Sequence, residues 1–282
     1  MQWWCAAQGV PWEWRWRPYP GVWAFLLVVA ATYTLVVRRQ ASRTPRSPEN
    51  PPGGTERRRI VSFAVGLGAL WVALDWPIGT LGAGYLVSVH MVQFLLISLA
   101  APPLLLHGLP RELLQRLERP APCQRLLRAV THPVVALLTF NAVLIATHWP
   151  AAVDGLMASQ AGSFLLDMAW LGAGGLFWWP IVSPVPARPG FPYPLKIGYL
   201  ILNTVLVTAP FAFLTFSEWP FYRIYELAPP IAGIGTQQDQ RLAGVLMKLG
   251  GGTILWTAAG VLFFRWYRAE GDPAKEPDAG SP

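Results

Sequence analysis

Three tripeptides place an ionisable side chain directly before Trp-Pro at the end of an apolar run. They are residues 75–77, 148–150 and 218–220, which read Asp-Trp-Pro, His-Trp-Pro and Glu-Trp-Pro. Tryptophan is enriched where a membrane meets water, and proline ends a helix because it has no backbone N–H to donate. The recurrence indicates either a helix-ending anchor used three times or the rim of a polar site.

Imidazole, thioether and carboxylate side chains recur near these tripeptides. Met91 follows His90, and Met247 lies eight residues after Asp239, which puts the acid and the thioether on one face of a helix. Thioethers select Cu(I), and imidazole also suits copper. We therefore expect a copper-handling set, against the alternative that methionine only fills gaps in the core. The candidate metal ligands and their charge partners are His90, Met91, His148, Asp239, Met247, Asp75 and Asp167.

The composition identifies the solvent that surrounds these residues. Of the 282 residues, 53% are hydrophobic and only 13% are charged, which is too few charges for a soluble surface. The apolar residues form blocks close to the ~20 residues that a helix needs to cross a bilayer. We predict an all-α, polytopic membrane protein with about seven transmembrane helices. The predicted spans are Gly21–Val37, Ile60–Trp76, Tyr85–Leu106, Pro133–Trp149, Ser163–Ser183, Ile197–Ser217 and Leu242–Phe264.

The distribution of basic residues predicts the orientation of these spans. Arginines concentrate in the segments 38–59 and 107–131, and further basic residues follow in the fifth loop and the tail. By the positive-inside rule these segments are cytoplasmic, so the N-terminus is outside and the C-terminus is cytoplasmic. The net charge of +7 then reflects topology and attraction to the bilayer, not binding of nucleic acid.

The ionisable candidates fall in the outer third of the predicted bundle. His90 lies about one and a half turns below the outer surface, while Asp75 and His148 end their helices there. Ionisable groups within a membrane are expensive and usually face a cavity or each other, so this cluster is a functional-site hypothesis. The alternative is that the acids cap helices and the Trp-Pro pairs are anchors. We interpret His107 and His132, at the inner surface, as interfacial or capping residues.

The remaining segments predict little chemistry. Residues 1–20 are rich in tryptophan and lack a cleavage site, so we expect an outer interfacial segment before a retained first helix. The transmembrane bundle then occupies 21–268 with a cytoplasmic linker at 38–59, and 269–282 form a disordered cytoplasmic tail.

The two cysteines are predicted on opposite sides of the membrane. Cys5 is expected to be exposed outside, and Cys123 lies in a cytoplasmic loop, so they cannot form a disulfide with each other. Cys5 could assist a soft metal, although an incidental thiol is the simpler interpretation.

Lys248 lies within the last predicted span. A positive charge there needs an acid or a path to the interface, and Asp75, Asp167 or Asp239 could supply the acid. An ion pair that only holds helices together would then account for part of the polar cluster.

Several spaced segments resemble the CtaG family of bacterial cytochrome c oxidase assembly factors. The stretch 85–110, YLVSVHMVQFLLISLAAPPLLLHGLP, is similar to the family's His-Met-x-x-His helix and its following proline-containing segment. The other similar segments are 132–133, 148–150, Leu-Phe-Trp-Trp-Pro at 176–180, and Asp-Gln-x-x-Ala-Gly-x-x-Met-Lys at 239–248. The resemblance covers roughly residues 60–268 in the same order, and such spaced matches are more specific than one short motif.

The resemblance implies a seven-helix protein of the bacterial inner membrane that helps to mature a haem-copper oxidase, by delivering copper to an oxidase subunit. A periplasmic copper chaperone is a further implied partner, and no enzymatic activity is implied. His90 and Met91 match the family's histidine-methionine pair, His148 its loop-proximal histidine, and Asp239 and Met247 its last-helix motif.

Two positions depart from the family pattern. Phe94 stands where the family usually has a second histidine, which removes half of a two-histidine clamp on one helix face. Asp167 stands where a histidine-containing segment is expected. Three functions therefore stay open: transient copper handling, a metal-free scaffold for oxidase subunits, and a transporter of copper or another small solute. The sequence contains no Ser-His-Asp grouping, phosphate loop or His-Glu-x-x-His helix that would favour an enzyme.

Overall fold

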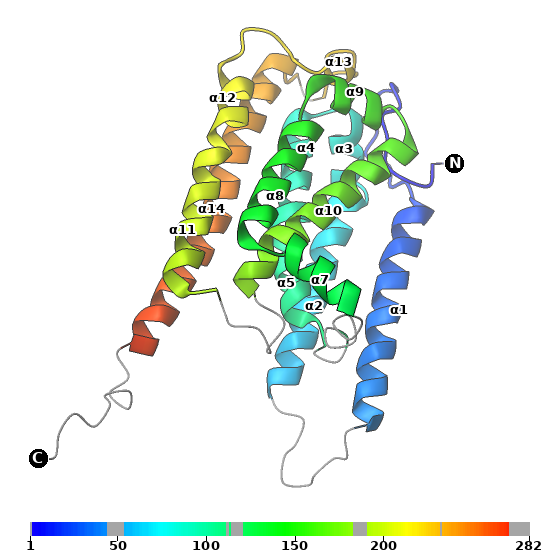
Figure 1. Ribbon diagram of the computed structural model, residues 1–282. Coiled ribbons are helices and arrows are strands. Elements are labelled where there is room, and N and C mark those ends of the chain that lie inside the picture. Colours follow the sequence, from blue (N-terminus) through cyan, green and yellow to red (C-terminus); the bar gives the residue numbers. More distant parts are fainter. Residues whose placement is uncertain are drawn as a thin grey trace, which may run out of the picture.

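The computed structural model describes residues 2–43, 54–110, 113, 121–182, 191–231 and 233–270, and these ranges contain helices and no strands (Figure 1). Within them, five helices are long and apolar enough to cross a membrane. Two further pairs of helices, bent by 45° and 66°, bring the number to seven if each pair forms one span. The prediction of an all-α, multi-pass membrane protein is therefore confirmed, while its orientation stays a prediction.

The helices follow the predicted apolar runs in order. Their bounds are α1 (Pro20–Arg43), α2 (Gly54–Leu74), α3 (Ile78–Gly84), α4 (Val87–Leu95), the π-helical segment η1 (Leu96–Ala100), α5 (Ala101–Gly108), α7 (Ala121–Val130), α8 (Pro133–Thr147), α9 (Pro150–Met157), α10 (Gln160–Val182), α11 (Tyr193–Leu206), α12 (Thr208–Phe216), α13 (Arg223–Glu226) and α14 (Thr236–Glu270). Helices reach into both ends of the predicted linker 38–59, because a polar helix end can continue beyond the hydrocarbon. The middle of that linker and nearly all of the predicted tail 269–282 lie outside the described residues.

The third span is the most buried of the candidate spans and lies at the centre of the fold. It runs through α4, η1 and α5, and these helices pack against α2, α3, α10 and α14. Pro102 and Pro103 have no N–H to donate to the carbonyls of Ser98 and Leu99, so the α-helical ladder is interrupted one turn earlier. The π-helical segment occupies that turn. The Ser98 carbonyl in this segment faces Gly174 of α10. Only glycine fits there, because a Cβ would lie too close to the carbonyl oxygen.

All three Trp-Pro tripeptides follow a helix end directly, as predicted. Helices α2, α8 and α12 end one or two residues before Asp75, His148 and Glu218. Figure 1 shows these helix ends, with α9 and α13, at the same end of the bundle as the N-terminal segment. The first residues differ, however, because Asp75 and His148 are buried whereas Glu218 is exposed. The tripeptides share a structural role but not an environment.

The N-terminal segment 2–19 packs onto this same end of the bundle. The Trp3 backbone N–H donates to Oε1 of Gln160 at 2.7 Å, and the Ala7 N–H donates to the Met157 carbonyl at 3.1 Å. Trp4 is 1% exposed. Cys5, which we expected to be exposed, is buried as well, because its thiol packs beside α2 and α3 and donates to the Leu74 carbonyl at 3.3 Å.

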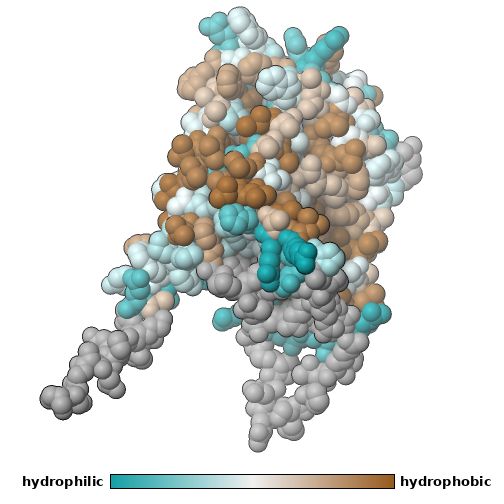
Figure 2. All heavy atoms as spheres, viewed as in Figure 1, coloured by the Kyte–Doolittle hydropathy of each residue, from teal (hydrophilic) through white to brown (hydrophobic). Residues whose placement is uncertain are grey.

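The outer surface agrees with a membrane location. Figure 2 shows apolar side chains across the middle of the visible face, with polar side chains gathered toward its ends. Large exposed apolar residues lie on α1, α8, α11 and α14, among them Leu27, Leu138, Val205 and Phe264. This pattern is the reverse of a soluble protein's, as expected where lipid replaces water.

A buried histidine pair as the candidate functional site

His90 lies one turn into α4 and is completely buried. Neither of its ring nitrogens makes a hydrogen bond of good geometry to a described residue, although the Gly82 backbone lies near the ring. A buried imidazole normally has a partner, since an unpaired polar group inside a protein or a bilayer costs about 1–3 kcal/mol. Among the described residues, His90 is the side chain with two buried polar atoms that both lack a hydrogen bond.

His148 faces His90 from the C-terminal end of α8, with 6.1 Å between the two ring centroids. Its Nδ1 lies 2.8 Å from the Leu144 carbonyl oxygen. Because a carbonyl only accepts, Nδ1 must carry the proton, and Nε2 of the neutral ring then keeps a lone pair. Nε2 is buried and has no partner among the described residues. Metal-binding histidines are commonly fixed in this way, with the second ring nitrogen donating to a carbonyl.

Aromatic rings enclose the pair. Trp170 of α10 lies 4.9 Å from His90 and 5.8 Å from His148, measured between ring centroids. Phe94 packs edge-on against His148 at 4.8 Å, and so occupies space next to the histidine pair. The position where the resemblance led us to look for another histidine thus supplies a hydrophobic wall.

Asp167 ties three segments together near the pair. Its Oδ2 accepts from Trp4 Nε1 at 2.8 Å, and its Oδ1 accepts from Gln93 Nε2 at 3.1 Å. Trp4 belongs to the N-terminal segment, Gln93 to α4 and Asp167 to α10. Both carboxylate oxygens are therefore engaged in holding these segments in place.

Asp239 has a comparable structural role. Its carboxylate accepts from the backbone N–H of Val87 at 2.5 Å and of Ser88 at 3.3 Å, and also from the Ser88 hydroxyl. These N–H groups are the free donors at the start of α4, where the N-cap residue Leu86 offers no side-chain cap. The capping alternative thus describes Asp239 well, although the helix that it caps is α4 and not its own.

The other candidates do not join the histidine pair in one cluster. Asp75 Oδ2 accepts from Trp71 Nε1 at 3.0 Å, Met91 is buried in the core, and Met247 lines a separate cavity. Among the described residues, no three His, Cys, Asp or Glu side chains form a group that could hold a metal ion. The structure therefore brings together His90 and His148 out of the seven candidates.

Tyr225 also borders the site, although the sequence did not single it out. The Tyr225 ring lies 6.0 Å from that of His90, and its hydroxyl donates to the Gly82 carbonyl and lies 3.4 Å from Met157 Sδ. Burial raises the pKa of Tyr225 well above its ordinary value, so the hydroxyl stays a neutral donor. Tyr225 is on the four-residue helix α13, too short to give a periodic signal. Met157, its sulfur partner, is buried at the end of the eight-residue helix α9.

Comparisons with known proteins agree with the resemblance found in the sequence. Residues 31–269 match the family model described as cytochrome c oxidase caa3 assembly factor. An uncharacterized protein of Mycobacterium bovis and one of Mycobacterium tuberculosis are each 25% identical to the chain over 157 residues. The match covers 50% of this chain but only 24% of each relative, so the chain spans a small part of their length. No solved structure matches the chain significantly.

Proposed function

The chain belongs to the family of cytochrome c oxidase caa3 assembly factors, and from this membership we propose that it handles copper for an oxidase subunit. The proposed site is the pair His90 and His148, at the outer side of the bacterial inner membrane. Copper is the cargo in this proposal and not a resident cofactor. A periplasmic copper chaperone would supply it, and the oxidase subunit would receive it.

The observation that carries this proposal is the set of unpartnered nitrogens on two facing imidazoles. His148 presents Nε2, and His90 presents both ring nitrogens, in a space walled by aromatic rings. Imidazole nitrogen suits copper, and a thioether such as that of Met157 would favour Cu(I). A carrier must release its metal, and a sparse set of two nitrogen ligands is compatible with exchangeable binding.

The position of the pair supports a route for the metal. His148 directly precedes Trp149, which is 65% exposed at the end of the bundle, while His90 is fully buried. A copper ion entering from this end would meet His148 before His90. The engaged carboxylates of Asp167 and Asp239 would then keep the surrounding helices fixed while the metal is exchanged.

The proposal is tested by His90→Gln, His148→Gln and the double variant, which remove the imidazoles but retain a polar side chain. His107→Gln and His132→Gln are matched controls, because these histidines are exposed and lie at the opposite ends of the same two spans, at the end of α5 and before the start of α8. We expect the purified site variants to bind Cu(I) at least about 10-fold more weakly in competition with a chromophoric chelator. In cells, the copper-to-haem ratio of the oxidase should fall although the assembly factor reaches its normal abundance.

A metal-free scaffold is the second candidate, favoured by Phe94 packed against His148 and by the lack of a third ligand in the described residues. The two functions differ in one outcome. If deletion of the protein abolishes oxidase assembly while the double histidine variant supports an oxidase with full copper content, the copper proposal is wrong and the scaffold function holds.

A further inference from the structure

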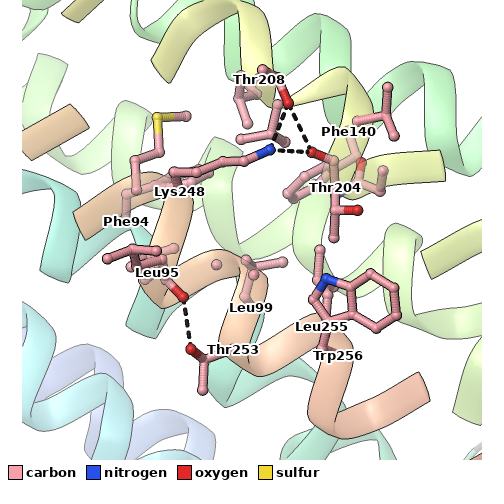
Figure 3. A pocket seen from close by; sticks show the side chains of 18 residues that line it. Phe94, Leu95, Leu99, Phe140, Thr204, Thr208, Lys248, Thr253, Leu255 and Trp256 are labelled. Carbon is pink, nitrogen blue, oxygen red and sulfur yellow. Dashed lines mark hydrogen bonds between the residues drawn. The ribbon is translucent and has the colours of Figure 1, made fainter. Parts of the chain in front are cut away.

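A cavity of about 520 Å³ lies between α4, η1, α8, α11 and α14, separate from the histidine pair (Figure 3). This volume is within the range of small-molecule sites, roughly 300–1,000 Å³. Its walls are mainly apolar, with Phe94, Phe140, Leu144, Leu255 and Trp256 among them. Phe94 both packs against His148 and lines this cavity, so its ring stands between the two spaces.

Lys248 brings a positive charge to this apolar cavity. Its Nζ donates to the Thr204 carbonyl at 3.0 Å and to the Thr208 hydroxyl at 2.6 Å (Figure 3). Both acceptors are neutral, and none of the described carboxylates forms the ion pair that the sequence led us to expect. An ammonium group has three donors, so one remains for another acceptor. Inside a membrane, such a charge is normally neutralised by an anionic group.

Asn203 adds a second unused donor to the same cavity. The residue is completely buried, and its Oδ1 accepts from Nδ2 of Asn141 at 2.9 Å. Its own Nδ2 has no partner among the described residues. Leaving a buried donor unpaired costs about 1–3 kcal/mol, so an acceptor supplied from outside the chain would be stabilised here. Asn203 and Lys248 line the cavity together.

The cavity is bordered by residues on the lipid-facing surface. Val205 and Leu249 line it and are 63% and 64% exposed. Lys248 follows the start of α14 at Thr236 by about 18 Å along the helix axis, at 1.5 Å per residue. The predicted span begins at Leu242, so Lys248 lies about 9 Å below the outer end of that span. A small carboxylate group can reach this level, whereas the bulky phosphate head of a lipid stays at the interface.

We propose that this cavity binds a single-chain carboxylic acid of the fatty-acid type, taken up sideways from the bilayer. The carboxylate lies between Lys248 Nζ and Asn203 Nδ2, where it neutralises the ammonium and accepts from the amide. The hydrocarbon chain lies against Phe140, Leu255 and Trp256. This proposal does not depend on copper handling, because neither histidine lines the cavity.

Native mass spectrometry of the purified full-length protein, titrated with palmitic acid or with methyl palmitate, tests the proposal. Palmitic acid should bind one molecule per chain, and the methyl ester, which lacks the charge, at least about 10-fold more weakly, since a hydrogen bond to a charged group contributes about 1.5–3 kcal/mol. Lys248→Met should weaken binding of the acid to the level of the ester, and Asn203→Leu should weaken it to a smaller extent.

A cavity-filling variant keeps the test independent of the charge change. A Cβ built at Gly252, which lines the cavity, or at Gly260, which does not, would meet nothing within 4 Å. Gly252→Phe should therefore abolish binding of palmitic acid, while Gly260→Phe on the same helix should bind like the wild type. Equal binding of acid and ester, or unchanged binding in Lys248→Met or Gly252→Phe, overturns the proposal. Retention of a phospholipid in place of the acid overturns it too.

Discussion

At the scale of single residues, carboxylates that look like metal ligands in the sequence are hydrogen-bond acceptors in the structure. Asp239 accepts from the start of α4, and Asp167 accepts from Trp4 and Gln93. A carboxylate inside a membrane needs several donors wherever it lies, whether or not it also binds a metal. Its presence in an apolar run therefore predicts a polar contact, but the sequence does not say which donors provide it.

Substitution of Asp239 measures how much such a hydrogen-bonded carboxylate contributes to stability. Asp239→Ala should destabilise the protein by about 1–3 kcal/mol, because the buried N–H groups of Val87 and Ser88 lose their acceptor. Asp239→Asn should cost less, since the amide oxygen can still accept. The measurement is the thermal unfolding temperature of the purified protein in detergent.

The matched control for this change is Asp154→Ala, which removes a carboxylate whose hydrogen bonds to the backbone at residues 223 and 224 lie on the exposed end of the bundle. We expect a smaller loss of stability there. If Asp239→Ala melts at the wild-type temperature but lowers Cu(I) affinity, the capping role is minor and Asp239 returns as a metal ligand.

At the scale of elements, the apolar runs predicted the positions of the long helices. They predicted only some of the breaks within and between these helices. The breaks after α2, α8 and α12 were visible because proline and tryptophan mark them. The π-helical turn at Leu96–Ala100 was not predicted, since the apolar pattern is the same on either side of it. The facing of His90 and His148 also depends on how α4 and α8 pack, and interhelical contacts leave no trace in a single sequence.

The close contact between η1 and α10 is another feature that the sequence did not predict. A substitution at Gly174 tests it. A Cβ at Gly174 would lie 2.2 Å from the Ser98 carbonyl oxygen, a backbone atom that cannot rotate away. Gly174→Ala should therefore force the two helices apart and destabilise the protein by about 1–3 kcal/mol, the usual cost of overpacking. Thermal unfolding in detergent again provides the measurement.

Two neighbouring glycines of α10 are matched controls. A Cβ at Gly172 or at Gly175 would meet nothing within 4 Å. Alanine is the better helix former by about 0.8–1 kcal/mol, so Gly172→Ala and Gly175→Ala should leave the unfolding temperature unchanged or raise it. A Gly174→Ala protein as stable as these controls would mean that η1 and α10 do not approach as closely as described.

At the scale of the whole molecule, the bundle has two chemically different ends. The N-terminal segment, the histidine pair and the three Trp-Pro tripeptides lie at one end, while α7 and the C-terminal end of α14 lie toward the other (Figure 1). Arginines concentrate in the segments predicted at that second end. The positive-inside rule predicts that the second end is cytoplasmic, as the proposed delivery of copper on the outer side requires.

The two cysteines can report this orientation in the unmodified protein. Cys123 is exposed on α7, whereas Cys5 is buried at the opposite end. Burial raises the pKa of the Cys5 thiol, so the reactive thiolate is scarce at pH 7–8 and becomes abundant only at higher pH. A membrane-impermeant maleimide at neutral pH should therefore label Cys123 alone, in inverted vesicles and not in spheroplasts.

Cys123→Ser is the control for this labelling, because it should abolish the signal of the native protein. In SDS, where Cys5 is no longer buried, the wild type should take up a second maleimide and the variant a single one. Labelling of Cys123 in spheroplasts would show that the protein has the opposite orientation. The histidine pair would then open to the cytoplasm, and any copper bound there would have to come from a cytoplasmic donor instead of a periplasmic chaperone.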